Sequence, residues 1–206
     1  MPLLRPFRDY NEKDVINLYT FSGQANTSTI VNRGTLVKIA GDGWRNDTEP
    51  TELIGSYGDF SVNNVQANRY GTPAKVTYCS SGTGDLPLGI TLFDVRELDE
   101  NLIPLKYNPR KAAELEACIS GQTVPIVTKG TFLISGVQSG SLIVPGGPIY
   151  AGGNGELSAF SVKCATNGRT DGLGAGYFSG QALSPIVGKF LGVTGTDGFC
   201  LIKLSL

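Results

Sequence analysis

Histidine is absent from the 206 residues of this sequence. Its absence excludes the Ser-His-Asp and Cys-His arrangements of nucleophilic catalysis and histidine-bearing zinc sites, and it removes the commonest general base. Cysteine is scarce as well, with four residues that never form the close Cys-x-x-Cys pair of a typical zinc site. We therefore expect a chain without a metal site or a cofactor.

The four cysteines also lack the features of a disulfide scaffold. They are Cys79, Cys118, Cys164 and Cys200, spread widely along the chain, whereas secreted disulfide scaffolds are normally shorter and denser in cysteine. Cys118 and Cys200 lie in the apolar runs EACIS and GFCLIKL, where a free cysteine behaves as a small hydrophobic residue. The sequence thus predicts four free thiols.

Long apolar runs and a surplus of charge of one sign are missing too. No stretch approaches the ~18–20 apolar residues of a membrane span, and the first residues, MPLLRPFRDYNEKD, become charged too early for a signal peptide. The formal net charge is −1, from 17 basic and 18 acidic residues. Because this leaves no overall positive field to steer the chain onto nucleic acid, we expect a soluble protein that binds neither nucleic acid nor a membrane directly.

Catalytic motifs are missing even where the composition comes nearest to them. The glycine-rich stretches AGGNGE and DGLGAGYFSG fit neither phosphate-binding nor dinucleotide-binding patterns. Acidic residues gather in FDVRELDEN as Asp94, Glu97, Asp99 and Glu100. They straddle a predicted strand end and turn, which favours a solvated turn over a glycosidase-type carboxylate pair. We predict no catalytic residue and no enzyme, with a hydrolase that uses these acids as an alternative.

Glycine dominates what the sequence does contain, with 28 glycines beside 11 prolines. Average glycine usage is about 7%, and here glycines separate short β-branched and aromatic runs, as in strands joined by tight turns. The sequence predicts a mainly β fold, a glycine-rich β-barrel or β-sandwich domain with one short helix. The expected strands lie within residues 34–41, 72–80, 87–98, 123–136, 147–152 and 186–206.

Two dipeptides give more specific local predictions. Asn108 followed by Pro109 is a typical helix start, with asparagine as the N-cap and proline at the first helical position, and it predicts the helix over residues 109–115. Asp197 followed by Gly198 is a strong signal for a hairpin turn. It predicts that the last strand region folds back on itself.

The front of the chain differs from the rest, because charged and aromatic residues alternate there before the first convincing strand. We divide the sequence into an extended N-terminal arm, residues 1–22, and a β-rich domain, residues 23–206, whose strand-rich core is expected to begin near Gly34. Within the arm, NEKDVINLY fits one or two helical turns capped by Asn11, or an extended segment laid along a partner. The stretches NRGTLVKIAG and TKGTFLISG echo each other. They indicate either two similar β sub-domains or strand-turn chemistry that repeats in any β protein.

Three stretches together resemble a known class of viral proteins. They are LPLGITLFDVRELDENLIPLKYNPRKAAELEACISGQTVPIVTKGTFLISG, GGPIYAGGNGELS and VGKFLGVTGTDGFCLIKL. They resemble the head decoration, or cement, proteins of tailed bacteriophages, and the arm LLRPFRDYNEKDVINLYTFSG resembles the start of the same proteins. The resemblance spans most of the chain apart from roughly residues 40–70 and 160–183. It implies a structural virion protein, made in the host cytoplasm, that binds the outer capsid surface and reinforces the lattice of the major capsid protein. It also implies self-association, most commonly as a homotrimer.

Within the arm, Arg5, Phe7, Arg8 and Tyr10 are the candidates for contact with the capsid, because arginine and aromatic residues are enriched at interface hot spots. The competing interpretation is that Phe7 and Tyr10 pack back on the chain's own domain. A different function is a carbohydrate-binding or adhesin-type β-domain. Trp44 and Tyr57 would supply its aromatic platform.

Overall fold

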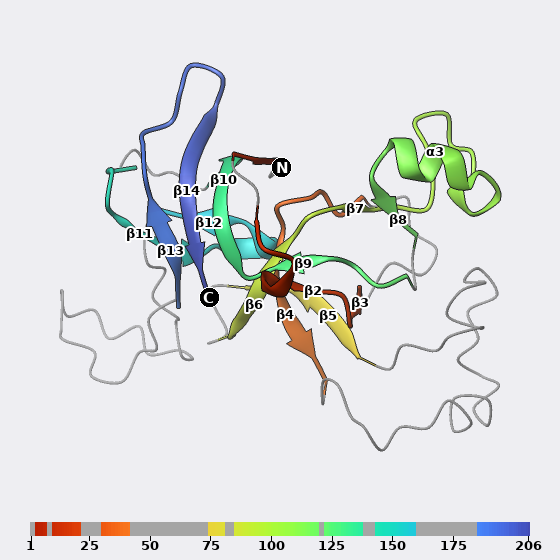
Figure 1. Ribbon diagram of the computed structural model, residues 1–206, viewed down its shortest axis with the longest axis horizontal. Helices are drawn as coiled ribbons and strands as arrows, with labels where there is room; N and C mark the ends of the chain where they lie inside the picture. The colour runs from red at the N-terminus through yellow and green to blue at the C-terminus, as the bar shows by residue number, and fades with distance from the viewer. Residues whose placement is uncertain are drawn as a thin grey trace, which may run out of the picture.

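The structure is a computed structural model that describes residues 3–7, 10–21, 30–41, 74–80, 85–119, 122–137, 143–159 and 185–206 (Figure 1). Within these residues the strands form two six-stranded sheets and one two-stranded sheet. A single α-helix accompanies them in the described part of the chain. The predicted mainly β class is therefore confirmed.

The first six-stranded sheet, sheet A, is antiparallel throughout. Its long central strand pairs along its whole length with one neighbour from a distant part of the sequence, and along part of its length with the strand that directly precedes it. In spatial order its strands are β1 (Leu3–Pro6), β10 (Lys129–Ser135), β14 (Phe199–Ser205), β13 (Ile186–Phe190), β11 (Pro148–Ala151) and β12 (Leu157–Ser158). A short 3-10 turn, η3 (Gly153–Gly155), joins the last two.

The second six-stranded sheet, sheet B, is antiparallel except at one edge, where β3 runs parallel to β5. In spatial order its strands are β2 (Val15–Ile16), β9 (Ile126–Val127), β6 (Pro87–Thr91), β4 (Leu36–Ala40), β5 (Lys75–Tyr78) and β3 (Thr20–Phe21). A parallel pair needs a long connection between its strands, and here the chain between β3 and β5 passes through β4.

Sheets A and B meet at a corner around Thr128. The chain leaves sheet B at the end of β9 and enters sheet A at the start of β10, with Thr128 between them. The amide of Thr128 donates to the carbonyl of Asp14 at 2.9 Å, and the carbonyl of Thr128 accepts from the amide of Leu206 at 3.1 Å. The predicted strand region, residues 123–136, thus contains two strands that belong to two sheets.

One hydrophobic core fills the space between the two sheets. Sheet B contributes Leu36, Ile90 and Val127, all fully buried. Sheet A faces them with β1, β10, β14, β13, β11 and β12 side chains, namely Leu4, Phe132, Ile134, Cys200, Ile202, Leu204, Val187, Phe190, Ile149, Ala151 and Leu157. Burial of this many large apolar side chains is the main stabilising term of such a fold.

Sheet B is buried on its other face as well. In β4 Leu36 belongs to the core shared with sheet A, whereas Val37 belongs to a second cluster, and in β9 the same division separates Val127 from Ile126. Successive side chains of a strand point to opposite faces, so sheet B is the middle layer. The second cluster also includes Val95 and Cys118 from the parallel pair β7 (Asp94–Val95) and β8 (Ala117–Cys118), together with Tyr19, Phe21, Val31, Ala74, Val76 and Val124.

Between β7 and β8 the chain forms an excursion that includes η2 (Leu105–Tyr107) and α3 (Pro109–Glu114), at the opposite end of the molecule from sheet A (Figure 1). The predicted helix is confirmed, because Asn108 Oδ1 accepts from the amide of Lys111 at 3.2 Å and Pro109 opens the helix. The predicted strand 87–98 is interrupted instead. Its first part is β6 in sheet B, and after a bend at Leu92 and Phe93 its second part is β7 in the small sheet.

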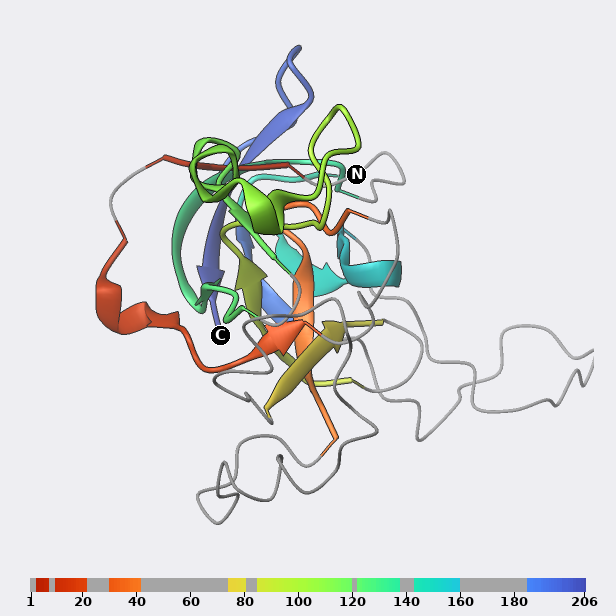
Figure 2. The ribbon, with the colours of Figure 1, turned by 90° about the vertical axis from the view of Figure 1, so that its right-hand side faces the viewer.

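The N-terminal segment is mostly extended, and its short strands pair with strands of the domain, while the helical turn between them projects outward (Figure 2). Asn11 caps a single 3-10 turn, η1 (Glu12–Asp14), with its Oδ1 accepting from the amide of Lys13 at 3.0 Å. On either side β1 pairs with β10 and β2 pairs with β9. The core therefore includes Leu4, which is 1% exposed, and begins before Gly34.

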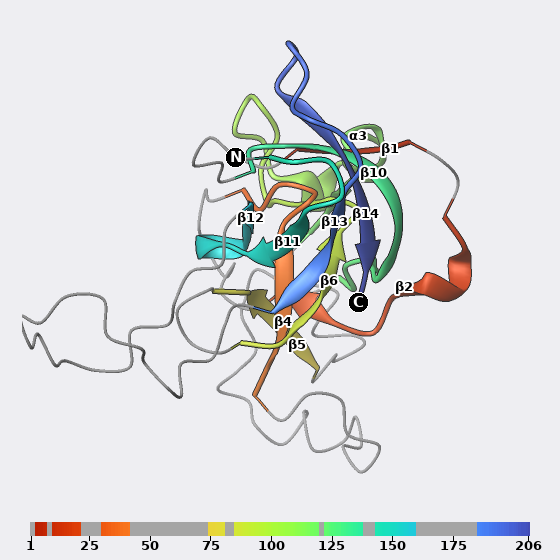
Figure 3. The same cartoon turned by 90° about the vertical axis from the view of Figure 1, so that its left-hand side faces the viewer.

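The predicted hairpin near the end of the chain is confirmed. Strands β13 and β14 are antiparallel neighbours, and the amide of Gly198 donates to the carbonyl of Gly195 at 3.1 Å. Asp197 Oδ1 accepts from the amide of Phe199 at 3.2 Å. The loop of this hairpin projects beyond the rest of sheet A (Figures 1 and 3).

Candidate functional site

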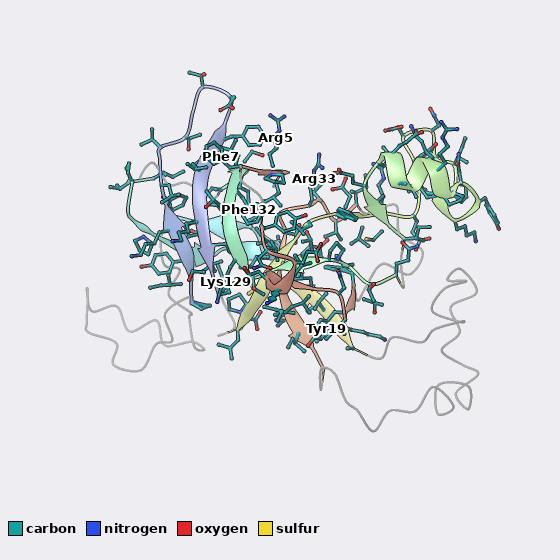
Figure 4. The ribbon with its side chains drawn as sticks, in the orientation of Figure 1. Arg5, Phe7, Tyr19, Arg33, Lys129 and Phe132 are labelled. Carbon is teal, nitrogen blue, oxygen red and sulfur yellow. The ribbon has the colours of Figure 1, made fainter. Side chains whose placement is uncertain are left out.

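Two of the contact candidates in the arm face outward from sheet A (Figure 4). Arg5 is exposed on the edge strand β1, and its guanidinium carbon lies 4.4 Å from the centre of the Phe199 ring on β14. Such a cation–π contact fixes the side chain without neutralising it. Phe7, just after β1, is 51% exposed. Both side chains are thus presented to solvent by a strand that is itself held in the sheet.

The other two candidates are placed differently or lie outside the described residues. Tyr10 packs against the core between the sheets, with its ring centre 6.1 Å from that of Phe132. The interpretation that part of the arm packs on its own domain is therefore right for Tyr10. Arg8 lies outside the described residues. The structure brings Arg5 and Phe7 to one surface and turns Tyr10 away from it.

Around Arg5 the outer face of sheet A bears three more basic side chains, which the sequence analysis did not single out. We call Arg5, Lys129, Lys189 and Lys203 the basic face. All four side chains are exposed, and in Figure 4 Arg5 and Lys129 lie toward opposite ends of β10. The register puts them on one side of the sheet, because Arg5 pairs with Leu133, Lys129 with Ser205, and Lys203 with both Thr131 and Lys189.

The charge on this face has one sign. The six strands of sheet A contain no aspartate or glutamate, although the whole chain has a net charge of −1. Ion pairs in the described residues occur elsewhere, as Lys38–Asp85 at 2.7 Å, Lys111–Glu100 and Arg110–Glu114 at 3.4 Å each, and Arg33–Glu116. The basic face therefore has a local positive charge that the net charge of the whole chain does not reveal.

Two of the four acidic residues considered for hydrolysis, Asp94 and Asp99, accept hydrogen bonds from backbone amides. Asp99 is buried, and its Oδ1 accepts from the amides of Asn101 and Ile103 at 2.7 and 2.8 Å. Asp94 Oδ1 accepts from the amide of Arg33 at 2.7 Å. Carboxylates that accept hydrogen bonds from backbone amides stabilise turns. In the described part of the chain, acids and cysteines form no cluster of three or more that could hold a metal ion.

The prediction of free cysteines is confirmed for Cys79, Cys118 and Cys200, while Cys164 lies outside the described residues. Burial is the main cause that raises the pKa of each of these three thiols to about 11. Neighbouring carboxylates raise the pKa further, Asp85 for Cys79 and Asp94 for Cys118. Because the thiolate is the reactive form, these three side chains are unreactive core residues at neutral pH.

The carbohydrate-binding alternative depends on Trp44 and Tyr57, and both lie outside the described residues. Among the described helices, none has the length and apolar character needed to cross a membrane. Comparison of the chain with protein-family models, curated protein sequences and solved structures finds no match. These comparisons therefore assign no function to the chain.

Proposed function

We propose that the chain is a structural virion protein, a head decoration protein that binds the outer surface of a tailed-bacteriophage capsid and stabilises the lattice of its major capsid protein. The proposal is supported by the resemblance of the arm and of three domain segments to cement proteins. It is also supported by the chemistry of the described residues, in which Asp94 and Asp99 accept backbone hydrogen bonds and three cysteines are buried. In this proposal the protein acts by binding.

The observation that carries the proposal is the outward presentation of Arg5 and Phe7 on the edge of sheet A. Strand β1 is anchored by Leu4, which is buried, while Arg5 on the opposite side of the strand is exposed and lies against Phe199. Arginine and aromatic side chains contribute a large share of the energy at protein interfaces. Because pairing of β1 with the sheet already orders this segment, less conformational entropy is lost when the two side chains bind a partner.

The proposal includes self-association as a homotrimer on the outer capsid surface. A decoration protein bridges several capsid subunits, and a trimer multiplies weak contacts through effective concentration. Strand β1 is an edge strand among the described strands of sheet A, and edge strands are surfaces that a neighbouring copy can cover. Near-zero net charge does not oppose association.

Binding to capsids tests the proposal with a matched pair of double variants. Capsids of the virus that encodes this chain, prepared without it, are sedimented with wild-type protein, with R5A/F7A, and with the control Y107A/R110A. The control removes the same two kinds of side chain, because Tyr107 is 76% exposed and the Arg110 side chain is 91% exposed, in the excursion far from sheet A. Truncating two hot-spot side chains costs about 2 kcal/mol each, so R5A/F7A should bind roughly a thousandfold more weakly.

The control variant should bind as the wild type does. Melting curves of all three proteins establish that the variants are folded. Wild-type protein that fails to sediment with the capsids would contradict the proposed function. Equal binding by R5A/F7A and the wild type would contradict the assignment of the contact to Arg5 and Phe7.

A further inference from the structure

Two neighbouring rows of side chains cross the outer face of sheet A, one made mostly of leucines and the other containing two lysines. One row runs from Arg5 through Leu133 and Leu201 to Leu191, whose amide donates to the carbonyl of Leu201 at 2.8 Å. The next row contains Thr131, Lys203, Lys189 and Pro148. Figure 3 shows β10, β14, β13 and β11, the strands that supply these rows, lying next to one another. On this face, cations therefore lie beside half-exposed aliphatic groups.

Lys189 and Lys203 are direct cross-strand partners in this surface. Like charges directly opposite each other destabilise a sheet. No ion pair with an acidic residue of the described chain relieves the repulsion. The pair therefore lowers the stability of the isolated protein, and an external group with negative charge placed between the two ammonium groups would remove that cost.

The chemistry of the surface favours an acidic protein over nucleic acid. Sheet surfaces that bind single strands use exposed aromatic rings on which bases stack. Here the apolar positions between the cations are leucines, and the ring of Phe199 is already covered by the guanidinium of Arg5. Phe7 is an exposed ring on this side, but it lies just after β1 and not between the lysines. Leucine side chains with flanking lysines match instead a protein surface that has aliphatic groups surrounded by carboxylates.

We infer that the basic face, with Leu133, Leu191 and Leu201 between its cations, is a docking surface for an acidic protein surface, and that Lys189 and Lys203 together bind one carboxylate cluster of that partner. Identification of the partner as the outer surface of the capsid rests on the proposed function. The docking surface itself rests only on the register, exposure and charge of sheet A. It extends the contact from the edge strand β1 to the neighbouring strands β10, β14 and β13.

The inference is tested with poly-L-glutamate as an acidic polypeptide and with the undecorated capsids as the proposed partner. Binding is measured for the full-length wild type, for K189E/K203E and for the control K13E/K75E. The control changes the net charge equally at two exposed lysines outside sheet A. We expect K189E/K203E to weaken binding to both probes by about tenfold or more, since attraction becomes repulsion at two contacts. The control should stay within about twofold of the wild type, and added salt should reduce the difference between the variants.

The two probes separate failure of the inference from failure of the proposed function. Loss of poly-L-glutamate binding by K189E/K203E, in a protein that never binds capsids, supports the docking surface and overturns the capsid as its partner. If K189E/K203E and K13E/K75E weaken binding equally, or if neither weakens it, the docking surface is overturned even if the wild type binds capsids. Poly(dT) and phosphatidylserine vesicles serve as alternative anionic probes. If the wild type binds either one more tightly than poly-L-glutamate, and K189E/K203E loses that binding, the acidic protein is overturned as the occupant.

Discussion

At the scale of single residues, Lys203 combines a cost to stability with a proposed gain in binding. Its side chain faces Lys189 directly across the β13–β14 pair. The substitution K203E replaces a like-charge pair with an opposite-charge pair, and such pairs contribute roughly 0.2–1 kcal/mol in a sheet. We therefore expect K203E to raise the free energy of unfolding by about that amount, measured by urea denaturation at low salt, while it weakens binding to poly-L-glutamate.

The matched control for this prediction is K75E, at an exposed lysine of sheet B. Surface substitutions of this kind usually change stability by less than about 0.5 kcal/mol. A fall in stability for K203E would show that the two lysines do not repel each other in the folded protein. Opposite effects of one substitution on stability and on binding are typical of functional surfaces.

Two glycines show why glycine is so frequent in this chain. Gly188, opposite Leu204, lies so close to β14 that a Cβ atom there would lie 2.2 Å from the carbonyl oxygen of Lys203. Gly34 has a φ of +90°, and a Cβ atom there would lie 3.1 Å from that of Leu4. Both positions lie where separate parts of the chain approach each other closely. The high glycine content therefore reflects close contacts between segments as well as turns.

At the scale of the element, strand β1 has a structural and a proposed binding role that fall on its two sides. Leu4 is 1% exposed and belongs to the core between the sheets. Replacing a buried leucine by alanine usually costs about 2–5 kcal/mol. We expect L4A to lower the free energy of unfolding by an amount in this range, measured by urea denaturation.

The control for Leu4 is L86A, because Leu86 is 79% exposed. This substitution should change stability by less than about 0.5 kcal/mol. Equal stability of L4A and the wild type would mean that β1 does not contribute to the core. Because Leu4 anchors the segment that presents Arg5 and Phe7, deletion of the whole arm would remove folding and binding contributions together, and side-chain substitutions separate them.

Local chemistry explains which elements could be predicted from the sequence. The helix at Pro109 and the turn at Gly198 depend on neighbouring residues, and both were predicted. The change of sheet at Thr128 was not, because its hydrogen bonds join it to Asp14 and Leu206, which are remote in the sequence. The basic face was missed for the same reason, since only the strand register brings Arg5 and Lys129 to the same side as Lys189 and Lys203.

At the scale of the whole molecule, the proposed trimer predicts a change of mass on assembly. Sedimentation velocity of the purified full-length protein should show a species of three times the 21.8 kDa chain mass. Its fraction should fall on dilution. Because the edges of sheet A are the surfaces that a second copy can cover, the trimer should resist the control substitutions K13E/K75E. A single species of monomer mass at every concentration would contradict a trimer formed before capsid binding.

The central position of β14 in sheet A has a consequence for the synthesis of the protein. Every other strand described is translated before it, yet β10 and β13 reach each other only through β14. Until β14 has been made, Lys203 is missing, and Lys129 and Lys189 belong to strands that no shared neighbour joins. A nascent or truncated chain thus lacks the assembled basic face, so partner binding through this surface selects chains that have been translated and folded through β14.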